Sequence, residues 1–124
     1  MRKWVLAAAM VAAMPVAASA ADAEAGKTVF NKCKACHQIG EGAKNAVGPH
    51  LDGVVGRKAG TAEGFNYSEA MKNSGLTWDE ATLNEYLTDP RKKVPGNKMV
   101  FMGLKNDDDR ANLIEFLKSQ SPAK

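Results

Sequence analysis

The sequence predicts an all-α domain with about five helices and long loops. Short stretches with apolar residues at helical spacing alternate with segments rich in glycine and proline, and each stretch begins with a residue that commonly caps a helix. No pair of alternating apolar and polar runs indicates a β-hairpin, and the chain shows neither an internal repeat nor a low-complexity tract. The predicted domain covers residues 21–124, after a short leader.

The first predicted helix runs from Ala21 to Lys34. Asp22 can accept backbone N–H groups of its first turn, and the carboxylate of Glu24 suits the positive end of the helix dipole. Small or apolar residues from Gly26 to Cys33 recur at i, i+3, i+4 and i+7, which places them on one face. This face leads into the cysteine-containing stretch that follows.

Four further short helices are predicted from their capping residues. The first covers Ser68 to Asn73 and is capped by its serine. A capping box from Thr77 to Glu80 opens the next helix, which ends near Leu87. Asp89-Pro90 starts one more helical turn with proline at its first position, and the segment from Asn106 to Asp109 caps the last helix.

Two long loops lie between these helices. The segment from Gly40 to Gly64 contains seven glycines and no sustained periodicity, which is typical of a compact loop rather than of a sheet. The second loop follows Pro95-Gly96 and carries Met99 and Met102. Because loops of this length in a small domain are usually functional, we expect them to wrap a bound group.

Residues 1–20 have the pattern of a signal peptide. Two basic residues precede an alanine-rich apolar run from Trp4 to Ala13, and Ala18-Ser19-Ala20 is a small-residue cleavage pattern. Cleavage before Ala21 would leave a mature chain of 104 residues in the periplasm. The alternative is an uncleaved membrane anchor, for which the apolar run is short and weakly hydrophobic.

The charge of the chain argues against general nucleic-acid binding. The full sequence carries 17 basic and 14 acidic residues, and without the predicted signal peptide 15 basic residues remain against the same 14 acidic ones. The charges are unevenly distributed, because acidic residues gather from Asp107 to Asp109 and basic ones between Arg91 and Lys105. This asymmetry predicts a dipolar surface with a docking face.

The strongest chemical signal is Cys33-Lys34-Ala35-Cys36-His37, the pattern of covalent c-type haem attachment. Two thiols on one turn can add to the two vinyl groups of a haem, and the imidazole of His37 can then reach the iron. The alternatives are a thioredoxin-like pair, which lacks a βαβ context, half of a zinc site, which lacks a second ligand pair, and a structural disulfide. We therefore expect one haem c attached through Cys33 and Cys36, with the carbonyl of Pro49 accepting the second ring N–H of His37.

The second axial position of the iron decides between electron transfer and ligand binding. The candidates are His50, Met71, Met99 and Met102. His50 fits better as a surface histidine, because it lies on the segment expected beside His37, and Met71 fits better as packing inside a helix. Met99 lies on a stiff loop far from the cysteines, and a His/Met pair would fill both positions and favour electron transfer.

Four motifs follow one another along the chain: Cys33 to His37, Gly48-Pro49, Gly56 to Gly60, and Tyr86 to Met99. With them, nearly the whole chain after the leader closely resembles the class I cytochromes c, of the bacterial cytochrome c2 type, and their mitochondrial relatives. The resemblance implies the small class I cytochrome c fold, in which about five helices and long loops wrap around one covalent haem.

The resemblance also implies roles for individual residues. His37 and Met99 would be the axial iron ligands, and the hydroxyl of Tyr86 would face the Met99 sulfur. The residues implied to surround the haem propionates are Arg57, Tyr67 and Trp78. The residues implied to form a basic ring at the haem edge, where redox partners dock, are Lys32, Arg91, Lys92, Lys98 and Lys105. The alternative for this ring is an ordinary solvated surface.

Three residues depart from the pattern of the relatives. Met71 stands where mitochondrial relatives usually have asparagine, Asn97 replaces a common threonine, and Met102 occupies a position that is usually small. Met102 is expected either to pack locally or to substitute for Met99 on the iron. The resemblance further implies that Gly26 packs against the last helix.

The function implied by the resemblance is that of a soluble periplasmic electron carrier and not of an enzyme. It would take one electron from a membrane cytochrome bc-type complex and give it to a terminal oxidase or a photosynthetic reaction centre, as a monomer that docks transiently through its charges. The alternatives are a haem peroxidase and a gas-binding cytochrome, and both require a displaceable Met99.

Overall fold

Five α-helices and one 3₁₀ turn form the framework of the molecule. The computed structural model describes residues 21–120, so the predicted signal peptide lies outside the described residues. The elements are α1 (Ala23–Val29), the 3₁₀ turn η1 (Phe30–Lys32), α2 (Glu69–Lys72), α3 (Glu80–Thr88), α4 (Pro90–Lys93) and α5 (Asp107–Ser119). In this part of the chain no strand occurs, and an isolated bridge joins Lys58 to Thr77. The predicted all-α class is therefore confirmed.

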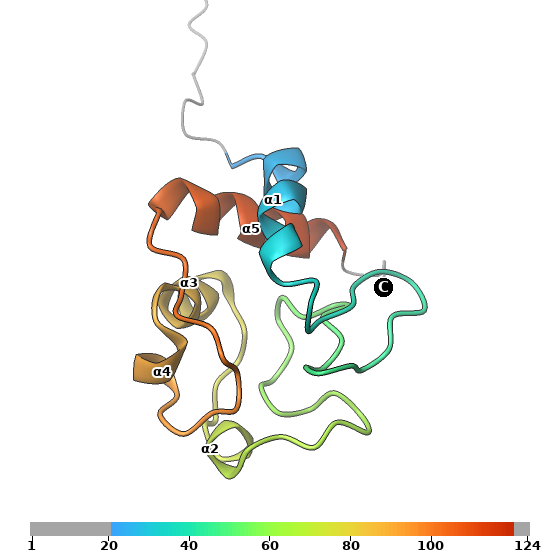
Figure 1. The fold of residues 1–124 in the computed structure, drawn as a ribbon, viewed down its shortest axis with the longest axis vertical. Coiled ribbons are helices and arrows are strands. Elements are labelled where there is room, and N and C mark those ends of the chain that lie inside the picture. The colour runs from blue at the N-terminus through green and yellow to red at the C-terminus, as the bar shows by residue number, and fades with distance from the viewer. Residues whose placement is uncertain (1–20, 121–124) are drawn as a thin grey trace, which may run out of the picture.

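The first and last helices, α1 and α5, pack across each other at Gly26 (Figure 1). A Cβ at this position would lie 1.9 Å from the carbonyl oxygen of Asn112 and 2.8 Å from the Cβ of Phe116. The rings of Phe30 and Phe116 lie with their centroids 5.4 Å apart, and the side chain of Asn112 accepts the backbone N–H of Asp22 at 2.8 Å. The expected packing of Gly26 against the last helix is confirmed, and it requires a residue without a side chain.

Helix α1 is shorter than the predicted range from Ala21 to Lys34. Its α-helical bonding ends at Val29, and the chain then tightens into η1 and a turn. The N–H of Cys33 bonds to the carbonyl of Phe30 at 2.7 Å, and the N–H of His37 bonds to the carbonyl of Cys33 at 3.0 Å. The apolar spacing continues through this change because a 3₁₀ turn redirects side chains only slightly, so the sequence pattern does not mark the boundary.

Side-chain caps begin the other helices, with one correction. The caps of α2, α4 and α5 are those predicted, namely Ser68, Asp89 and Asn106. The predicted capping box that starts at Thr77 is wrong, because Asp79 caps α3 and accepts the N–H of Thr82 at 2.8 Å. The backbone on either side of Thr77 is instead paired with the segment around Lys58, because the carbonyl of Leu76 accepts the N–H of Ala59 and the N–H of Trp78 donates to the carbonyl of Arg57, both at 2.9 Å.

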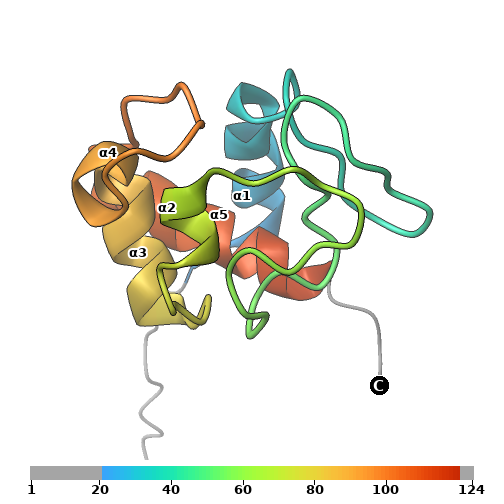
Figure 2. The same cartoon turned by 90° about the horizontal axis from the view of Figure 1, so that it is seen from below.

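The apolar core lies where α1, α3 and α5 meet the loops (Figure 1). Figure 2 shows the loop after α4 and the glycine-rich loop on either side of α1. One charged residue, Arg110 on α5, is buried here at 7% exposure, and its guanidinium donates to the side chain of Asn84 at 2.7 Å and to the carbonyl of Leu104 at 2.8 Å. Arg110 thus ties α5 to α3 and to the end of the loop after α4. Among residues 21–120, no helix has the length and apolar character needed to cross a membrane.

Candidate functional site

An apolar pocket lies between the two long loops. Its lining comes from nearly every part of the described chain, including the cysteine motif, the glycine-rich loop, α3, the loop after α4, and α5. The apolar residues of the lining include Phe30, Val47, Leu51, Val54, Phe65, Leu83, Leu87, Val100, Phe101, Leu113 and Leu117. Such walls suit a large apolar group that makes polar contacts at only a few positions.

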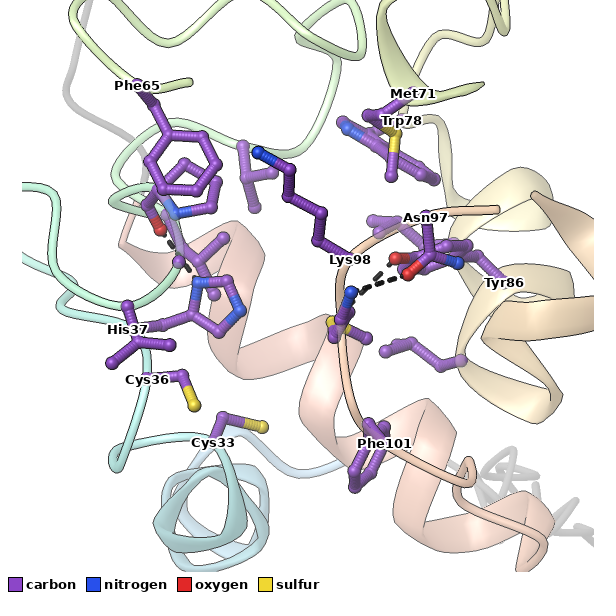
Figure 3. Close-up of a pocket in the computed structure, with 18 of the residues that line it drawn as sticks. Cys33, Cys36, His37, Phe65, Met71, Trp78, Tyr86, Asn97, Lys98 and Phe101 are labelled. Atoms are coloured by element: carbon purple, nitrogen blue, oxygen red, sulfur yellow. Dashed lines mark hydrogen bonds between the residues drawn. The ribbon is translucent and has the colours of Figure 1, made fainter. Parts of the chain in front are cut away.

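The two thiols of the cysteine motif point into this pocket. Figure 3 shows the sulfurs of Cys33 and Cys36 directed toward the space beside the His37 ring, and both cysteines are free. The structure therefore shows no disulfide between them. Burial, with a smaller contribution from Cys36, raises the pKa of the Cys33 thiol to about 11, so this thiol is protonated at neutral pH. No group of three His, Cys, Asp or Glu side chains within residues 21–120 is placed to hold a metal ion.

The glycine-rich loop holds the ring of His37 in one orientation. The Nδ1 of His37 donates to the carbonyl of Pro49 at 2.7 Å, which is the predicted contact, and the second ring nitrogen faces the pocket (Figure 3). A Cβ on Gly48 would lie 2.5 Å from Cε1 of the ring, so the ring occupies the space that a side chain there would need. Burial lowers the pKa of His37, which keeps the imidazole neutral and its Nε2 lone pair available to a metal.

The opposite wall presents the sulfur of Met99. Tyr86 and Asn97 lie across the pocket from His37 (Figure 3), and the Tyr86 hydroxyl donates to the Met99 sulfur at 3.7 Å. The ring of Tyr86 is buried against that of Trp78, with their centroids 4.9 Å apart. Burial raises the pKa of Tyr86 to about 12, so its hydroxyl remains a hydrogen-bond donor at physiological pH.

Arg57 lines the pocket, and one of its nitrogens is buried without an acceptor within residues 21–120. Its Nη1 donates to the carbonyl of Asp52 at 3.1 Å and its Nη2 to the carbonyl of His50 at 3.0 Å. Its buried Nε has no acceptor among the described residues. An unpaired buried N–H costs about 1–3 kcal/mol, so this position is suited to an acceptor from a bound group. A carboxylate is a strong match for a guanidinium.

Tyr67 and Trp78, the other residues implied to contact the propionates, also line the pocket. The Tyr67 hydroxyl accepts the backbone N–H of Ala62 at 2.9 Å, which leaves its own proton free to be donated. The expectation that His50 is an ordinary surface residue is wrong. Its side chain is half-buried, and its buried Nδ1 has no partner in the described part of the chain. Its place directly after Pro49, from which the sequence interpretation inferred exposure, did not indicate this burial.

The remaining candidate ligands differ in their surroundings. Met71 lines the pocket from α2 and is packed against the core, as expected for a packing residue. Met102 is 70% exposed and does not line the pocket. The expectation that Met102 packs locally is therefore wrong. A substitute iron ligand would have to lie inside the pocket, and the side chain of Met102 lies outside it.

The predicted docking residues are all exposed, and they are Lys32, Arg91, Lys92, Lys98 and Lys105. The pocket lining includes only two of them, Lys32 and Lys98. The Nζ of Lys98 donates to the carbonyl of Asn66 at 3.0 Å, and that of Lys105 donates to the carbonyl of Thr88 at 2.7 Å. These two ammonium groups are therefore anchored to the backbone, whereas Arg91 and Lys92 lie on α4.

The groups around the pocket fit a covalently attached haem. Two thiols on one turn match the two vinyl groups, and a neutral imidazole and a thioether from opposite walls match the axial positions of the iron. The apolar lining matches the macrocycle, and the unpaired guanidinium N–H of Arg57 matches a propionate. The residue types and their placement are therefore those that a c-type haem requires.

Comparisons with known proteins point to the same group. The model of the Cytochrome c family matches residues 23–121. The cytochrome c2 of Rhodoblastus acidophilus is 65% identical over 98 residues, which cover 79% of this chain and 92% of that protein. The structure of cytochrome cH from Methylobacterium extorquens is similar with a TM-score of 0.75 and 52% identity, covering 79% of this chain and 98% of that one. For cytochrome c2 from Rhodospirillum centenum the TM-score is 0.76 and the identity 41%, over 82% of this chain and 99% of that one. The chain therefore belongs to the cytochrome c family, as a class I cytochrome of the c2 type that carries one haem c bound through Cys33 and Cys36.

Proposed function

We propose that this electron-carrier cytochrome moves single electrons through the periplasm. The donor is a membrane cytochrome bc-type complex, and the acceptor is a terminal oxidase or a photosynthetic reaction centre. The family and the signal-peptide pattern of residues 1–20 support this assignment. The observation on which the proposal depends is the position of His37 and Met99 on opposite walls of an apolar pocket.

In this proposal, Nε2 of His37 and the sulfur of Met99 would hold the haem iron. The haem iron supplies a reversible one-electron change between its ferric and ferrous states. The bond from Nδ1 to Pro49 fixes the tautomer and the orientation in which His37 presents Nε2. The Tyr86 hydroxyl draws electron density from the Met99 sulfur. Because both ligands are held by packed walls, the electron transfer requires little movement of the protein.

Docking is proposed at the pocket, because its lining includes both exposed lysines and exposed apolar side chains. Val47 and Val100 are 74% and 87% exposed, and they line the pocket together with Lys32 and Lys98. The lysines attract an acidic partner, and the small apolar area permits close contact without tight binding. Salt screens this attraction over about 10 Å at 0.1 M, which suits a partner that must leave quickly. The residues that extend the positive charge are Arg91, Lys92 and Lys105.

A peroxidase or a gas-binding function would require an open iron position. The Met99 sulfur is in contact with Tyr86 and lies in the pocket lining, which favours an occupied position. These alternatives are therefore not favoured.

An optical spectrum of the purified holoprotein, with and without carbon monoxide, tests the proposal. We expect a weak far-red sulfur-to-iron band in the oxidised form and no response of the reduced form to carbon monoxide. Met99→Ala should lose the band and bind carbon monoxide, whereas Met71→Leu, which alters the same pocket, should retain the band. Prompt binding of carbon monoxide by the unaltered protein, without the band, would mean an open iron and would favour the alternatives.

A further inference from the structure

The segment that carries Met99 has few anchors in its own main chain. The N–H of Asn97 bonds to the carbonyl of Val94 at 3.1 Å, and the N–H of Leu104 bonds to the carbonyl of Leu87 at 2.7 Å. Between these two bonds, residues 98–103 form no backbone–backbone hydrogen bond within the described part of the chain. The position of Met99 therefore depends on bonds made by side chains.

The side-chain amide of Asn97 makes three such bonds. Its Nδ2 donates to the carbonyl of Pro90 at 3.0 Å and to that of Val94 at 2.8 Å. Its Oδ1 accepts the backbone N–H of Met99 at 2.7 Å. Pro90 begins α4 and Val94 caps its end, so one half-buried amide joins both ends of this helix to the main chain of Met99. Figure 3 shows Asn97 beside Tyr86, across the pocket from His37.

We propose that Asn97 is a positioning residue that keeps the sulfur of Met99 in place on the iron. The inference rests on the ligand role proposed above for Met99. Asparagine suits this task because one planar group offers two donors and an acceptor. A threonine hydroxyl offers one donor, and aspartate offers none when ionised.

The other side chains that restrain Met99 and its neighbours form weaker contacts. The Tyr86 hydroxyl reaches the sulfur at 3.7 Å, which is a long contact to a weak acceptor. The Lys98 ammonium bonds to the carbonyl of Asn66, but its side chain is exposed and water competes for this bond. Removal of the Asn97 amide is therefore the change expected to release Met99 most readily while leaving the side chains of Met99 and Tyr86 unaltered.

The test is the affinity of the oxidised holoprotein for imidazole at one fixed pH. Imidazole binds the iron only where the sulfur has left, so its apparent Kd reports the fraction of molecules in which Met99 is released. The loss of the far-red band is the signal that is measured as imidazole is added. Asn97→Ala removes all three bonds, and the loss of hydrogen bonds of ordinary net strength should lower the apparent Kd about ten- to a hundredfold.

Two further variants separate hydrogen bonding from packing. Asn97→Asp keeps an acceptor for the N–H of Met99 but turns oxygen atoms toward the carbonyls of Pro90 and Val94, so it should bind imidazole at least as tightly as Asn97→Ala. Asn97→Thr keeps one donor and one acceptor and should restore an intermediate affinity. If Asn97→Asp bound imidazole no more tightly than the unaltered protein, the Nδ2 bonds would have no role and the proposal would be wrong.

Asn45→Ala is the matched control. The Asn45 amide also bonds to backbone, donating to the carbonyl of Glu63 at 3.0 Å and accepting the N–H of His50 at 3.0 Å, but it lies in the glycine-rich loop. Its removal should lower the thermal midpoint and leave the imidazole affinity unchanged. Equal gains in affinity for Asn45→Ala and Asn97→Ala would indicate general loosening of the domain and would overturn the proposal.

The spectrum of the unaltered protein separates this inference from the proposed function. If it lacks the far-red band, the ligand role of Met99 fails, and the role of Asn97 fails with it. If it shows the band while every Asn97 variant keeps the original imidazole affinity, only the role of Asn97 is overturned. Should Asn97→Ala fail to accumulate as holoprotein, the comparison of Asn97→Thr with the unaltered protein decides.

Discussion

Replacement of Gly48 by alanine would place a methyl group where the ring of His37 lies. The added Cβ would be 2.5 Å from Cε1, 2.9 Å from Nδ1 and 3.0 Å from Nε2 of that ring. The backbone of Gly48 is held on both sides, because its N–H bonds to the carbonyl of Cys36 at 2.7 Å and its own carbonyl accepts the N–H of Ala46 at 2.8 Å. The ring must therefore move by roughly 1 Å to reach an ordinary contact distance, which breaks its bond to Pro49.

The expected loss of folding stability is about 2–4 kcal/mol, from overpacking a buried site and from the lost Nδ1 bond. In a domain of this size, each kcal/mol lowers the thermal midpoint by roughly 4–8 °C, so calorimetry of the holoprotein should show a fall of about 10–20 °C. Without the bond to Pro49, His37 becomes a weaker electron donor to the iron. The reduction potential measured by voltammetry should therefore rise.

Gly42→Ala, in the same loop, is the control for this prediction. Gly42 has a φ of +80° and an added Cβ would meet nothing within 4 Å, so its replacement costs only the backbone strain of about 1–2 kcal/mol. Gly48 is not among the glycines with positive φ, and its cost is one of contact. The reasoning is refuted if Gly48→Ala lowers the midpoint no more than Gly42→Ala does and leaves the potential unchanged.

Three other variants test separate parts of the structure. Gly26→Ala should lower the thermal midpoint by roughly 10 °C or more, because the new Cβ would lie 1.9 Å from a carbonyl oxygen of α5, whereas helix propensity alone would favour alanine by about 1 kcal/mol. Thr28→Ala on the exposed face of α1 should leave the midpoint nearly unchanged, and a stabilised Gly26→Ala would contradict the crossing. Burial raises the pKa of Tyr86 to about 12, so the folded chain holds this proton more tightly than the unfolded chain and loses stability as the pH rises from about 10 toward 12. Tyr86→Phe should lack this part of the loss in denaturant unfolding at stepped pH, and identical pH dependences would show that the hydroxyl is not protected. Replacement of both Arg91 and Lys98 by glutamate should slow electron transfer to an acidic partner roughly tenfold or more at low salt, in stopped-flow measurements, without changing the haem spectrum. An unchanged rate and salt dependence would place docking elsewhere.

The sequence predicted the start of a helix when the capping side chain bonds only to the backbone of the next few residues. Ser68 and Asn106 accept N–H groups three residues onward, so the local sequence contains the whole interaction. The start of α3 was not predictable in this way. Thr77 is withdrawn from the expected capping box by its bridge to Lys58, and no local pattern specifies that pairing.

In the site, reactive residue types were easier to predict than the bonds that position them. The cysteine motif is local, and the contacts of His37 with Pro49 and of Tyr86 with Met99 that were expected are present. The three bonds of Asn97 all lie within residues 90–99, but they form only because the chain turns back on α4 after this helix ends. The Nδ1 of His50 has no partner among residues 21–120, which no sequence pattern indicates. Sequence spacing identifies these two residues as polar but does not show what they contact.

The crossing of α1 and α5 has a consequence for folding kinetics. The bond between Asp22 and Asn112 joins residues 90 positions apart, so the two ends of the domain must find each other. All-helical domains usually fold quickly because most of their contacts are local, whereas the entropic cost of closing a loop grows with its length. Formation of the individual helices is fast, on the order of a microsecond. The slow step for this chain should therefore be the meeting of its ends, as in domains built from distant strand pairs.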